Sequence, residues 1–315
     1  MSRPHAVVTG GAGFLGSHLV DTLLDDGYHV TSLDNYGSGR PENLVHVESD
    51  RFESLEHDVR DPLPDFDRVD EVYHMASRAS PEDFESHAVE IALTNSEGTR
   101  NAIECALDHD ATVLLASTSE VYGDPEVHPQ HEDYNGSVNV RGPRTPYDES
   151  KRFGEALAVA YDQQYEVDVR TVRIFNTYGP RMRPDDGRVI PNFLSQALHG
   201  DDLTVYGDGT QTRSFCYVDD LIGGIRAVAT ADRSAAAGEV FNVGNTDEME
   251  IRELAEVVLD VVDTESGITH EPLPEDDPQV RRPDISKITA EFDWEPAVPL
   301  REGLSRTVAD YRELL

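Results

Sequence analysis

Residues 6–16 read Ala-Val-Val-Thr-Gly-Gly-Ala-Gly-Phe-Leu-Gly, and this stretch decides the fold. Its first four residues are small or β-branched and predict a buried strand, after which Gly10, Gly13 and Gly16 lead into an apolar helix. Glycine at these positions permits a tight turn and lets backbone N–H groups approach a diphosphate at the helix N-terminus. Asp34 ends the next predicted strand, where a carboxylate can accept both ribose hydroxyls of an adenosine and would repel a 2′-phosphate. The stretch therefore predicts a site for NAD rather than NADP.

Apolar strand-like runs alternate with amphipathic helical patterns, which is typical of a parallel sheet wrapped by helices. The predicted strands cover residues 6–9, 29–34, 52–57, 71–76, 112–117 and 169–175, with shorter runs at 203–206, 214–218 and 239–243. The predicted helices cover residues 14–26, 85–109, 146–165, 190–199, 219–231, 251–262 and 301–314. We expect an α/β fold with a Rossmann-type doubly wound sheet over residues 1–178, to which residues 214–243 return. Residues 179–213 and 244–315 would form a smaller mixed α/β domain for the substrate.

The charge of the chain is strongly negative, since 62 Asp and Glu against 26 Lys and Arg give a formal net charge of −36. Such a surface repels the phosphates of nucleic acid and an anionic membrane, so neither is an expected partner. Only Lys151 and Lys287 are lysines, and every other cation is an arginine. Carboxylates compete well for water in concentrated salt, and molar salt screens their mutual repulsion. We therefore expect a protein from the salt-rich cytosol of a halophile.

Two further observations bear on the compartment and on metals. Cys105 and Cys216 give neither a disulfide framework nor a metal-ligand spacing, which fits a reducing compartment and predicts no metal site. The sequence opens without a signal-peptide pattern and holds no apolar run near the roughly 18 residues of a membrane span. A cytoplasmic protein is therefore expected.

Tyr147 and Lys151 stand four residues apart, on one face of a predicted helix. A nearby ammonium lowers the pKa of a phenol from about 10 toward neutrality and makes a tyrosinate available as a base. An arginine would keep its proton, so a lysine at this place in a lysine-poor chain indicates a chemical demand. Thr118 and Glu120 follow the fifth predicted strand, at the edge where parallel sheets bind ligands. These two side chains can hydrogen-bond a substrate hydroxyl.

The glycine motif, the segment Ser117-Thr-Ser-Glu120 and the pair Tyr147/Lys151 together resemble the extended short-chain dehydrogenases of the nucleotide-sugar epimerase/dehydratase superfamily. The resemblance covers essentially the whole chain. Within the superfamily, seven further stretches are similar to the UDP-glucuronate decarboxylases, also called UDP-xylose synthases. They are residues 116–130, 142–144, 174–182, 186–189, 203–207, 211–213 and 276–279.

This resemblance implies an NAD-dependent decarboxylation of UDP-glucuronate to UDP-xylose through a 4-keto intermediate, with internal recycling of NAD. Tyr147, its pKa lowered by Lys151 and the nicotinamide charge, would remove the 4-hydroxyl proton, and Thr118 would orient that hydroxyl. Glu120 and Arg213 would manage the carboxylate and the proton delivered to C5. By similarity, the residues that hold the UDP-sugar are Asn176, Arg188, Tyr206, Gln211, Arg213 and Arg282. Those expected to contact NAD are Gly10, Gly13, Phe14, Leu15, Gly16, Asp34, Asn35, Ser38, Asp58, Val59, Ala76, Tyr147 and Lys151.

Three departures from the decarboxylase pattern leave other activities open. Arg78 stands where the decarboxylases usually have Pro, Ser150 replaces a Gly, and Asn135 replaces an aromatic residue. Because epimerases and dehydratases commonly have a serine at the position of Ser150, the alternative to a decarboxylase is a UDP-sugar 4-epimerase or a nucleotide-sugar 4,6-dehydratase. A non-catalytic dinucleotide-sensing protein is the remote alternative.

Two residues favour the decarboxylase among these activities. The 4-epimerases typically lack an acid at Glu120, and the dehydratases have an Asp where this chain has Ser119. The resemblance also implies a homodimer, paired through the helices predicted near residues 85–109 and 146–165.

Overall fold

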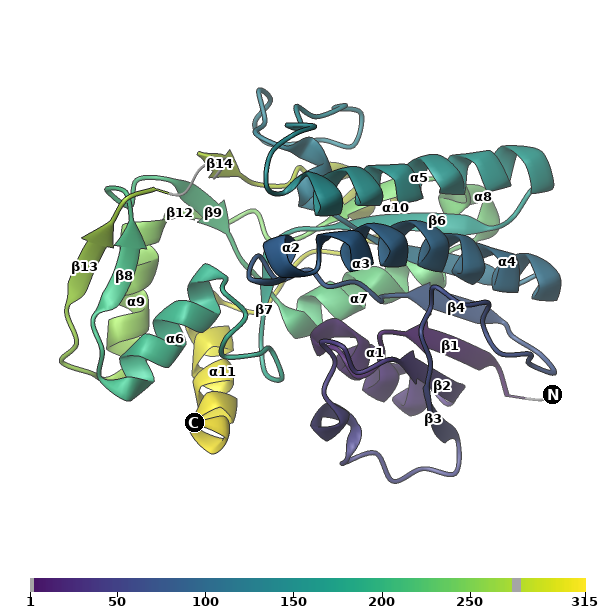
Figure 1. Cartoon of the computed structure of the whole chain (residues 1–315), viewed down its shortest axis with the longest axis horizontal. Helices are drawn as coiled ribbons and strands as arrows, with labels where there is room; N and C mark the ends of the chain where they lie inside the picture. Colours follow the sequence, from purple (N-terminus) through teal and green to yellow (C-terminus); the bar gives the residue numbers. More distant parts are fainter. Residues whose placement is uncertain (1–2, 274–278) are drawn as a thin grey trace.

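The computed structural model describes residues 3–273 and 279–315, and its larger lobe is built around one parallel sheet (Figure 1). Seven strands lie in the order β11-β6-β5-β4-β1-β2-β3, and every neighbouring pair is parallel. Their bounds are β1 His5–Thr9, β2 His29–Asp34, β3 Phe52–Glu56, β4 Glu71–His74, β5 Thr112–Thr118, β6 Val169–Ile174 and β11 Val240–Val243. The predicted Rossmann-type α/β fold is confirmed, and the strands expected in the first half occur within two residues of their predicted bounds.

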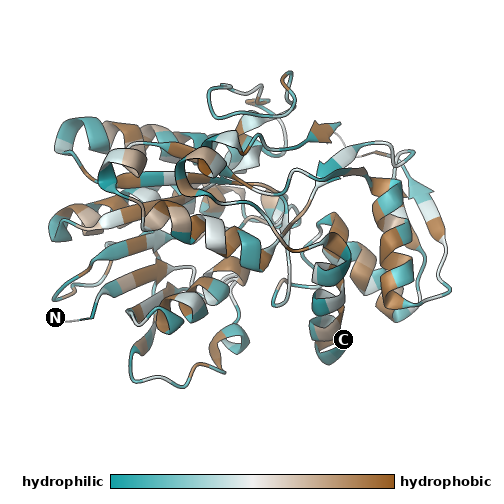
Figure 2. Cartoon of the chain, turned by 180° about the vertical axis from the view of Figure 1, so that it is seen from behind, coloured by the Kyte–Doolittle hydropathy of each residue, from teal (hydrophilic) through white to brown (hydrophobic). Residues whose placement is uncertain are grey.

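Alternating side chains bury both faces of this sheet. In β1, Ala6 and Val8 join the core formed with α1 and α7, whereas Val7 joins the core formed with α4 and α5. These helices are α1 Phe14–Asp25, α4 Thr99–His109, α5 Thr145–Tyr165 and α7 Val218–Ala229. Figure 1 shows α4 and α5 on one side of the sheet and α1 and α7 on the other, and in Figure 2 apolar residues alternate with polar ones along the helices. Because helices cover both faces of the sheet, its strands are almost continuously apolar, as the sequence shows.

The structure corrects the single regular helix predicted over residues 85–109. The segment forms α2 Asp83–Ser86, α3 Ala88–Leu93, a π-helical turn Thr94–Gly98 and then α4. The Thr99 hydroxyl donates to the Asn95 carbonyl at 2.7 Å, and a Cβ added to Gly98 would lie 2.8 Å from Val59 Cγ2. Hydroxyls that bond back to helix carbonyls distort a helix locally, and the close approach at Gly98 holds the wider turn in place.

The smaller lobe lies beside the carboxyl ends of the large sheet (Figure 1). It contains the parallel pair β8–β13 and the three strands β12-β9-β14, packed with α6, α9 and α11. Its elements are α6 Val189–His199, β8 Leu203–Tyr206, β9 Thr212–Ser214, β12 Glu248–Glu250, α9 Ile251–Val262, β13 Ile268–Glu271, β14 Val280–Arg281 and α11 Leu300–Leu314. The remaining short elements are η1 Pro41–Leu44, η3 Ser119–Tyr122, β7 Thr177–Tyr178, β10 Cys216–Tyr217, α8 Arg233–Ala236 and α10 Ser286–Phe292.

The order of the strands positions the site. β1 lies between β2 and β4, and the strand order runs from β1 toward β3 on one side and from β4 toward β11 on the other. At such a reversal of strand order, a crevice opens at the carboxyl ends of the strands. The smaller lobe stands over that crevice (Figure 1). Within residues 3–273 and 279–315, no helix has the length and apolar character needed to cross a membrane.

Candidate active site

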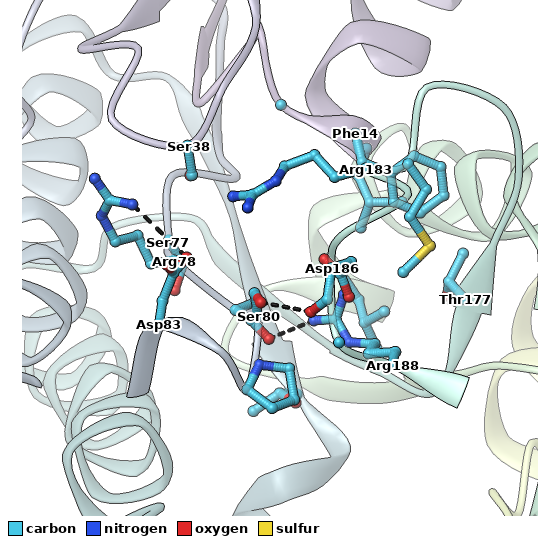
Figure 3. A pocket seen from close by; sticks show the side chains of 18 of the residues that line it. Phe14, Ser38, Ser77, Arg78, Ser80, Asp83, Thr177, Arg183, Asp186 and Arg188 are labelled. Atoms are coloured by element: carbon cyan, nitrogen blue, oxygen red, sulfur yellow. Dashed lines mark hydrogen bonds and ion pairs between the residues drawn. The ribbon is translucent and has the colours of Figure 1, made fainter. Parts of the chain in front are cut away.

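A cavity of about 490 Å³ occupies the crevice between the two lobes, and Figure 3 shows part of its lining. Most of the residues singled out in the sequence line it. They are Gly10, Gly13, Phe14, Leu15, Gly16, Asp34, Asn35, Ser38, Val59, Ala76, Thr118, Glu120, Tyr147, Lys151, Asn176, Arg188, Tyr206, Gln211 and Arg213. Asp58 and Arg282 are described but do not line it. Asp276, Asp277 and Pro278 of the decarboxylase-like motif lie outside the described residues.

The glycine loop leaves no room for side chains on its inner side. Gly10 has φ +69°, and a Cβ there would lie 2.7 Å from Ala76 Cα. A Cβ on Gly16 would lie 2.1 Å from the Gly10 carbonyl oxygen. Gly13 precedes the first turn of α1, whose leading N–H groups have no partners within the helix. The loop therefore offers a bare backbone floor and a helix N-terminus, which suit the diphosphate of a dinucleotide.

Asp34 is fixed by the backbone on both sides. Its Oδ2 accepts from the Ala12 N–H at 3.0 Å and its Oδ1 accepts from the Tyr36 N–H at 2.8 Å. Burial raises the pKa of Asp34, and these two hydrogen bonds oppose that effect. The carboxylate is thus oriented at the carboxyl end of β2 with lone pairs left for ribose hydroxyls, so the residues present fit NAD and disfavour a 2′-phosphate.

Asp58 is engaged beside the cavity rather than in its lining. Its carboxylate binds the Arg60 side chain and also accepts from Asn35 Nδ2 at 3.4 Å. The Arg60 hydrogen bond holds the pKa of Asp58 well below its usual range. Val59 and His57 line the cavity at this end instead, and His57 Nε2 is buried with no hydrogen-bond partner among the described residues.

Tyr147 and Lys151 lie on the first turns of α5, where both side chains are buried. The Tyr147 ring stacks on Phe84 with the ring centroids 5.0 Å apart, and its hydroxyl shares a hydrogen bond with Thr118. Lys151 Nζ donates to the Ala116 carbonyl at 2.7 Å and lies 5.9 Å from the centroid of the Tyr147 ring. The structure therefore brings together three residues that the sequence places on two separate elements, β5 and α5.

The electrostatics of this pair correct one expectation. Burial raises the pKa of Tyr147 to about 12, although the Arg188 charge and the Thr118 hydrogen bond lower it in part. Burial lowers the pKa of Lys151 to about 8, against the opposing charge of Glu155. The predicted lowering of the Tyr147 pKa by Lys151 is therefore wrong for the chain alone, because desolvation outweighs the charges near the phenol.

Glu120 is clamped between two arginines. Its Oε2 lies 2.7 Å from Arg144 Nη2, and its Oε1 accepts a hydrogen bond from Arg281 Nη1. Burial pushes the pKa of Glu120 upward, but the charges of Arg281 and Arg144 prevail and lower it to about 2. Glu120 is therefore an ionised group with both oxygens engaged. No role was expected for either arginine, although Arg144 lies in the stretch 142–144, three residues before Tyr147.

The smaller lobe contributes polar side chains to the other end of the cavity. Arg188 Nη1 lies 2.9 Å from Asp186 Oδ1, and both residues are labelled in Figure 3. Arg188 Nη2 also donates to the Ala79 carbonyl across the cleft. Gln211 Nε2 donates to the Tyr206 carbonyl at 2.9 Å, and Asn176 Nδ2 donates to the Ser214 carbonyl at 3.4 Å. Arg213 lies beside them with its Nη1 donating to the Thr212 carbonyl at 2.9 Å.

Arg281, not Arg282, faces the cavity from β14. The backbone of Arg282 pairs with Gln130, whose Oε1 accepts from the Arg282 N–H at 2.9 Å. Neighbouring residues of an extended segment point to opposite sides, so only one of two adjacent arginines can reach Glu120.

A family model described as the NAD dependent epimerase/dehydratase family matches residues 6–244. The chain belongs to this family. Two curated relatives of the chain are both named UDP-glucuronic acid decarboxylase 1. The one from Danio rerio is 48% identical over 314 residues, which is 99% of this chain and 74% of that protein. The one from Arabidopsis thaliana is 50% identical over 311 residues, which is 98% of this chain and 70% of that protein.

Solved structures give the same architecture. The UDP-glucuronic acid 4-epimerase of Bacillus cereus, in complex with UDP-glucuronic acid and NAD, matches with a TM-score of 0.88 and 28% identity, over 99% of this chain and all of that one. The predicted superfamily and NAD as its cofactor are thereby confirmed.

Proposed function

We propose that this enzyme decarboxylates UDP-glucuronate to UDP-xylose through a 4-keto intermediate. The observation that carries the proposal is the near full-length similarity, at 48% and 50% identity, to two UDP-glucuronic acid decarboxylases. The site supports it, because Tyr147, Thr118 and the clamped Glu120 line one cavity with Arg213. A ketone at C4 is β to the C5 carboxylate, so loss of CO₂ leaves a stabilised enolate.

Each side chain receives a role from its contacts. Thr118, hydrogen-bonded to Tyr147, orients the 4-hydroxyl, and the Tyr147 oxygen takes its proton. Arg188 favours the tyrosinate that accepts this proton, because its charge lowers the pKa of Tyr147. NAD, when bound between the glycine loop and Asp34, supplies a reversible hydride acceptor and a positive charge that favours the tyrosinate.

Glu120 and Arg213 serve the carboxyl end of the sugar in this proposal. With a pKa of about 2, Glu120 holds no proton at neutral pH, so it acts by orienting a proton-bearing group toward C5 rather than as the acid itself. Arg213, which lies in the lining of the same cavity, binds the carboxylate until CO₂ leaves. Gln211 and Tyr206 hold the UDP half from the smaller lobe, and Asn176 does so from the segment that follows β6. We propose that the smaller lobe is the substrate domain, made of residues 179–213 and 244–315.

The test is incubation of the purified protein with UDP-glucuronate and NAD in molar KCl, with separation of the nucleotide sugars. Release of CO₂ with formation of UDP-xylose is expected. Absence of turnover with any nucleotide sugar would favour a dinucleotide-sensing protein instead. A 4-keto-6-deoxy product, formed from a sugar that carries a 6-hydroxyl, would indicate a dehydratase.

A 4-epimerase is the second candidate, and one observation favours it. The B. cereus epimerase, which shares the fold over the whole chain, was solved with UDP-glucuronic acid, the substrate proposed here. The same incubation separates the two activities, since an epimerase would return a product that keeps its carboxylate.

We further propose that the enzyme is a homodimer paired through α3, α4 and α5. These helices leave apolar side chains exposed, including Val89 at 73% and Phe153 at 52%. Light scattering on the eluting protein should give twice the chain mass, and Phe153→Asp should halve it. Val45→Asp, at a residue that is 74% exposed on another part of the lobe, should leave the dimer intact.

The composition supports a further proposal, that the enzyme works in the salt-rich cytosol of a halophile. At a net charge of −36, screening of carboxylate repulsion stabilises the fold and lets an anionic substrate approach. Turnover and melting temperature should both rise with KCl toward molar concentrations. Maximal turnover in salt-free buffer would contradict this proposal.

A further inference from the structure

Arg78 spans the groove that the dinucleotide enters. Its segment rests on the glycine loop, because Ala76 touches Gly10 so closely that a Cβ on Gly10 would lie 2.7 Å from Ala76 Cα. Its side chain reaches the loop after β2, where a Cβ on Gly37 would lie 2.6 Å from Arg78 Nη2. The Arg78 side chain therefore connects the loops that follow β2 and β4.

Two carboxylates hold Arg78 in this place. Its Nε donates to Glu90 Oε1 at 2.8 Å, and its Nη1 lies 3.6 Å from Asp83 Oδ2, which is too long for a hydrogen bond. Its side chain is only 14% exposed, and it belongs to the lining of the cavity. Figure 3 shows the contact between Arg78 and Asp83 as a dashed line.

The other two nitrogens of the Arg78 guanidinium differ from Nε in their contacts. Among the residues that the structure describes, neither Nη1 nor Nη2 of Arg78 has a hydrogen-bond acceptor, although both are polar groups at the wall of the cavity. A guanidinium with two nitrogens that have no acceptor suits a phosphate, which it can bind bidentately. The diphosphate of a dinucleotide lies on the glycine loop of such folds, and that loop lines the same cavity as Arg78.

We propose that Arg78 is a further cofactor-binding residue, which contacts the diphosphate of NAD and slows its release. The proposal depends on the dinucleotide site and not on the decarboxylation proposed above.

The test measures binding without turnover. NADH is titrated by its own fluorescence in molar KCl, and ADP and adenosine are used as competitors, for the wild type and for Arg78→Gln. The dissociation constants of NADH and of ADP should rise about tenfold in the variant, whereas that of adenosine should change less than twofold. Arg68→Gln removes the same charge at a site outside the cavity and should change none of the three.

Two results would overturn the proposal. Unchanged NADH affinity in Arg78→Gln would mean that the guanidinium does not touch the cofactor. An equal loss for adenosine and ADP would mean that Arg78 only shapes the loop after β2. If Arg78→Gln loses the native circular dichroism spectrum, Arg78→Lys decides, since it keeps a charge for the diphosphate and should lose less than half of the affinity.

Discussion

Removing the charge of Glu120 should destabilise the whole fold, because the buried Arg281 and the partly buried Arg144 both pair with it. Glu120 contacts Arg144 and Arg281, and the side chains of the three residues are 15%, 23% and 4% exposed. Glu120→Gln keeps the shape of the side chain but removes the carboxylate charge that both guanidinium groups contact. Breaking a buried ion pair by removing one partner is strongly destabilising, since the remaining charge stays desolvated.

The size of the effect follows from the pKa of Glu120. Its folded value of about 2 lies below the ordinary 4.5, a difference that corresponds to about 3 kcal/mol at about 1.36 kcal/mol per pH unit. Because the folded pKa is the lower one, this stabilisation is complete above about pH 4.5 and is lost as the pH falls toward about 2. For a chain of this size, a loss of about 3 kcal/mol lowers the melting temperature by roughly 6 °C.

The assay is thermal and denaturant unfolding of both proteins in molar KCl at one fixed pH, because burial and the Glu120 charge raise the pKa of the neighbouring Asp148 to about 7. Glu302→Gln is the matched control, since Glu302 pairs with Arg306 on the exposed face of α11 and is itself 51% exposed. It should cost less than about 0.5 kcal/mol. A melting temperature of Glu120→Gln equal to that of the control would refute the reasoning.

Three further predictions concern the catalytic pair and the glycine loop. Tyr147→Phe keeps the ring stacked on Phe84 but removes the hydroxyl. Steady-state kinetics should therefore show kcat reduced by roughly 10²–10⁴-fold, while the melting temperature changes little. Turnover within a few-fold of the wild type would contradict the role assigned to Tyr147. Gly16→Ala would place a Cβ 2.1 Å from the Gly10 oxygen, so calorimetry should show NAD affinity reduced by at least about tenfold, and an unchanged affinity would contradict the fit. The folded pKa of Lys151 is about 8, below its ordinary value of 10.5, so the unfolded chain binds this proton more tightly than the folded chain does. The charged lysine therefore lowers the stability of the fold below about pH 8, and this stability is regained as the pH rises to 10.5. Lys151→Met should therefore be inactive yet no less stable than the wild type at pH 7 in denaturant unfolding, and a clear loss of stability would contradict the lowered pKa.

The part of the site that was predictable is the part that depends on local backbone geometry. Gly10 and Gly16 are needed because any side chain there would collide with the backbone, and Asp34 is needed at the end of its strand. These requirements are local, so a short stretch of sequence is enough to recognise them. The same holds for the sheet, whose buried strands appear as short apolar runs.

The missing part depends on contacts between distant segments. The clamp on Glu120 includes Arg281, which lies 161 residues away along the chain, and nothing local separates Arg281 from Arg282. The raised pKa of Tyr147 comes from burial beneath several elements, and a four-residue spacing carries no information on that burial. The π-helical turn within residues 85–109 likewise reflects a tertiary contact of Gly98 with Val59.

The most direct test of decarboxylation is the reaction run in D₂O with UDP-glucuronate and catalytic NAD in molar KCl, followed by proton NMR. The proposed sequence of steps predicts UDP-xylose that carries one deuterium at C5, one CO₂ for each sugar consumed, and no net accumulation of NADH. A product that keeps its carboxylate and has hydrogen at C5 would contradict it and would identify an epimerase.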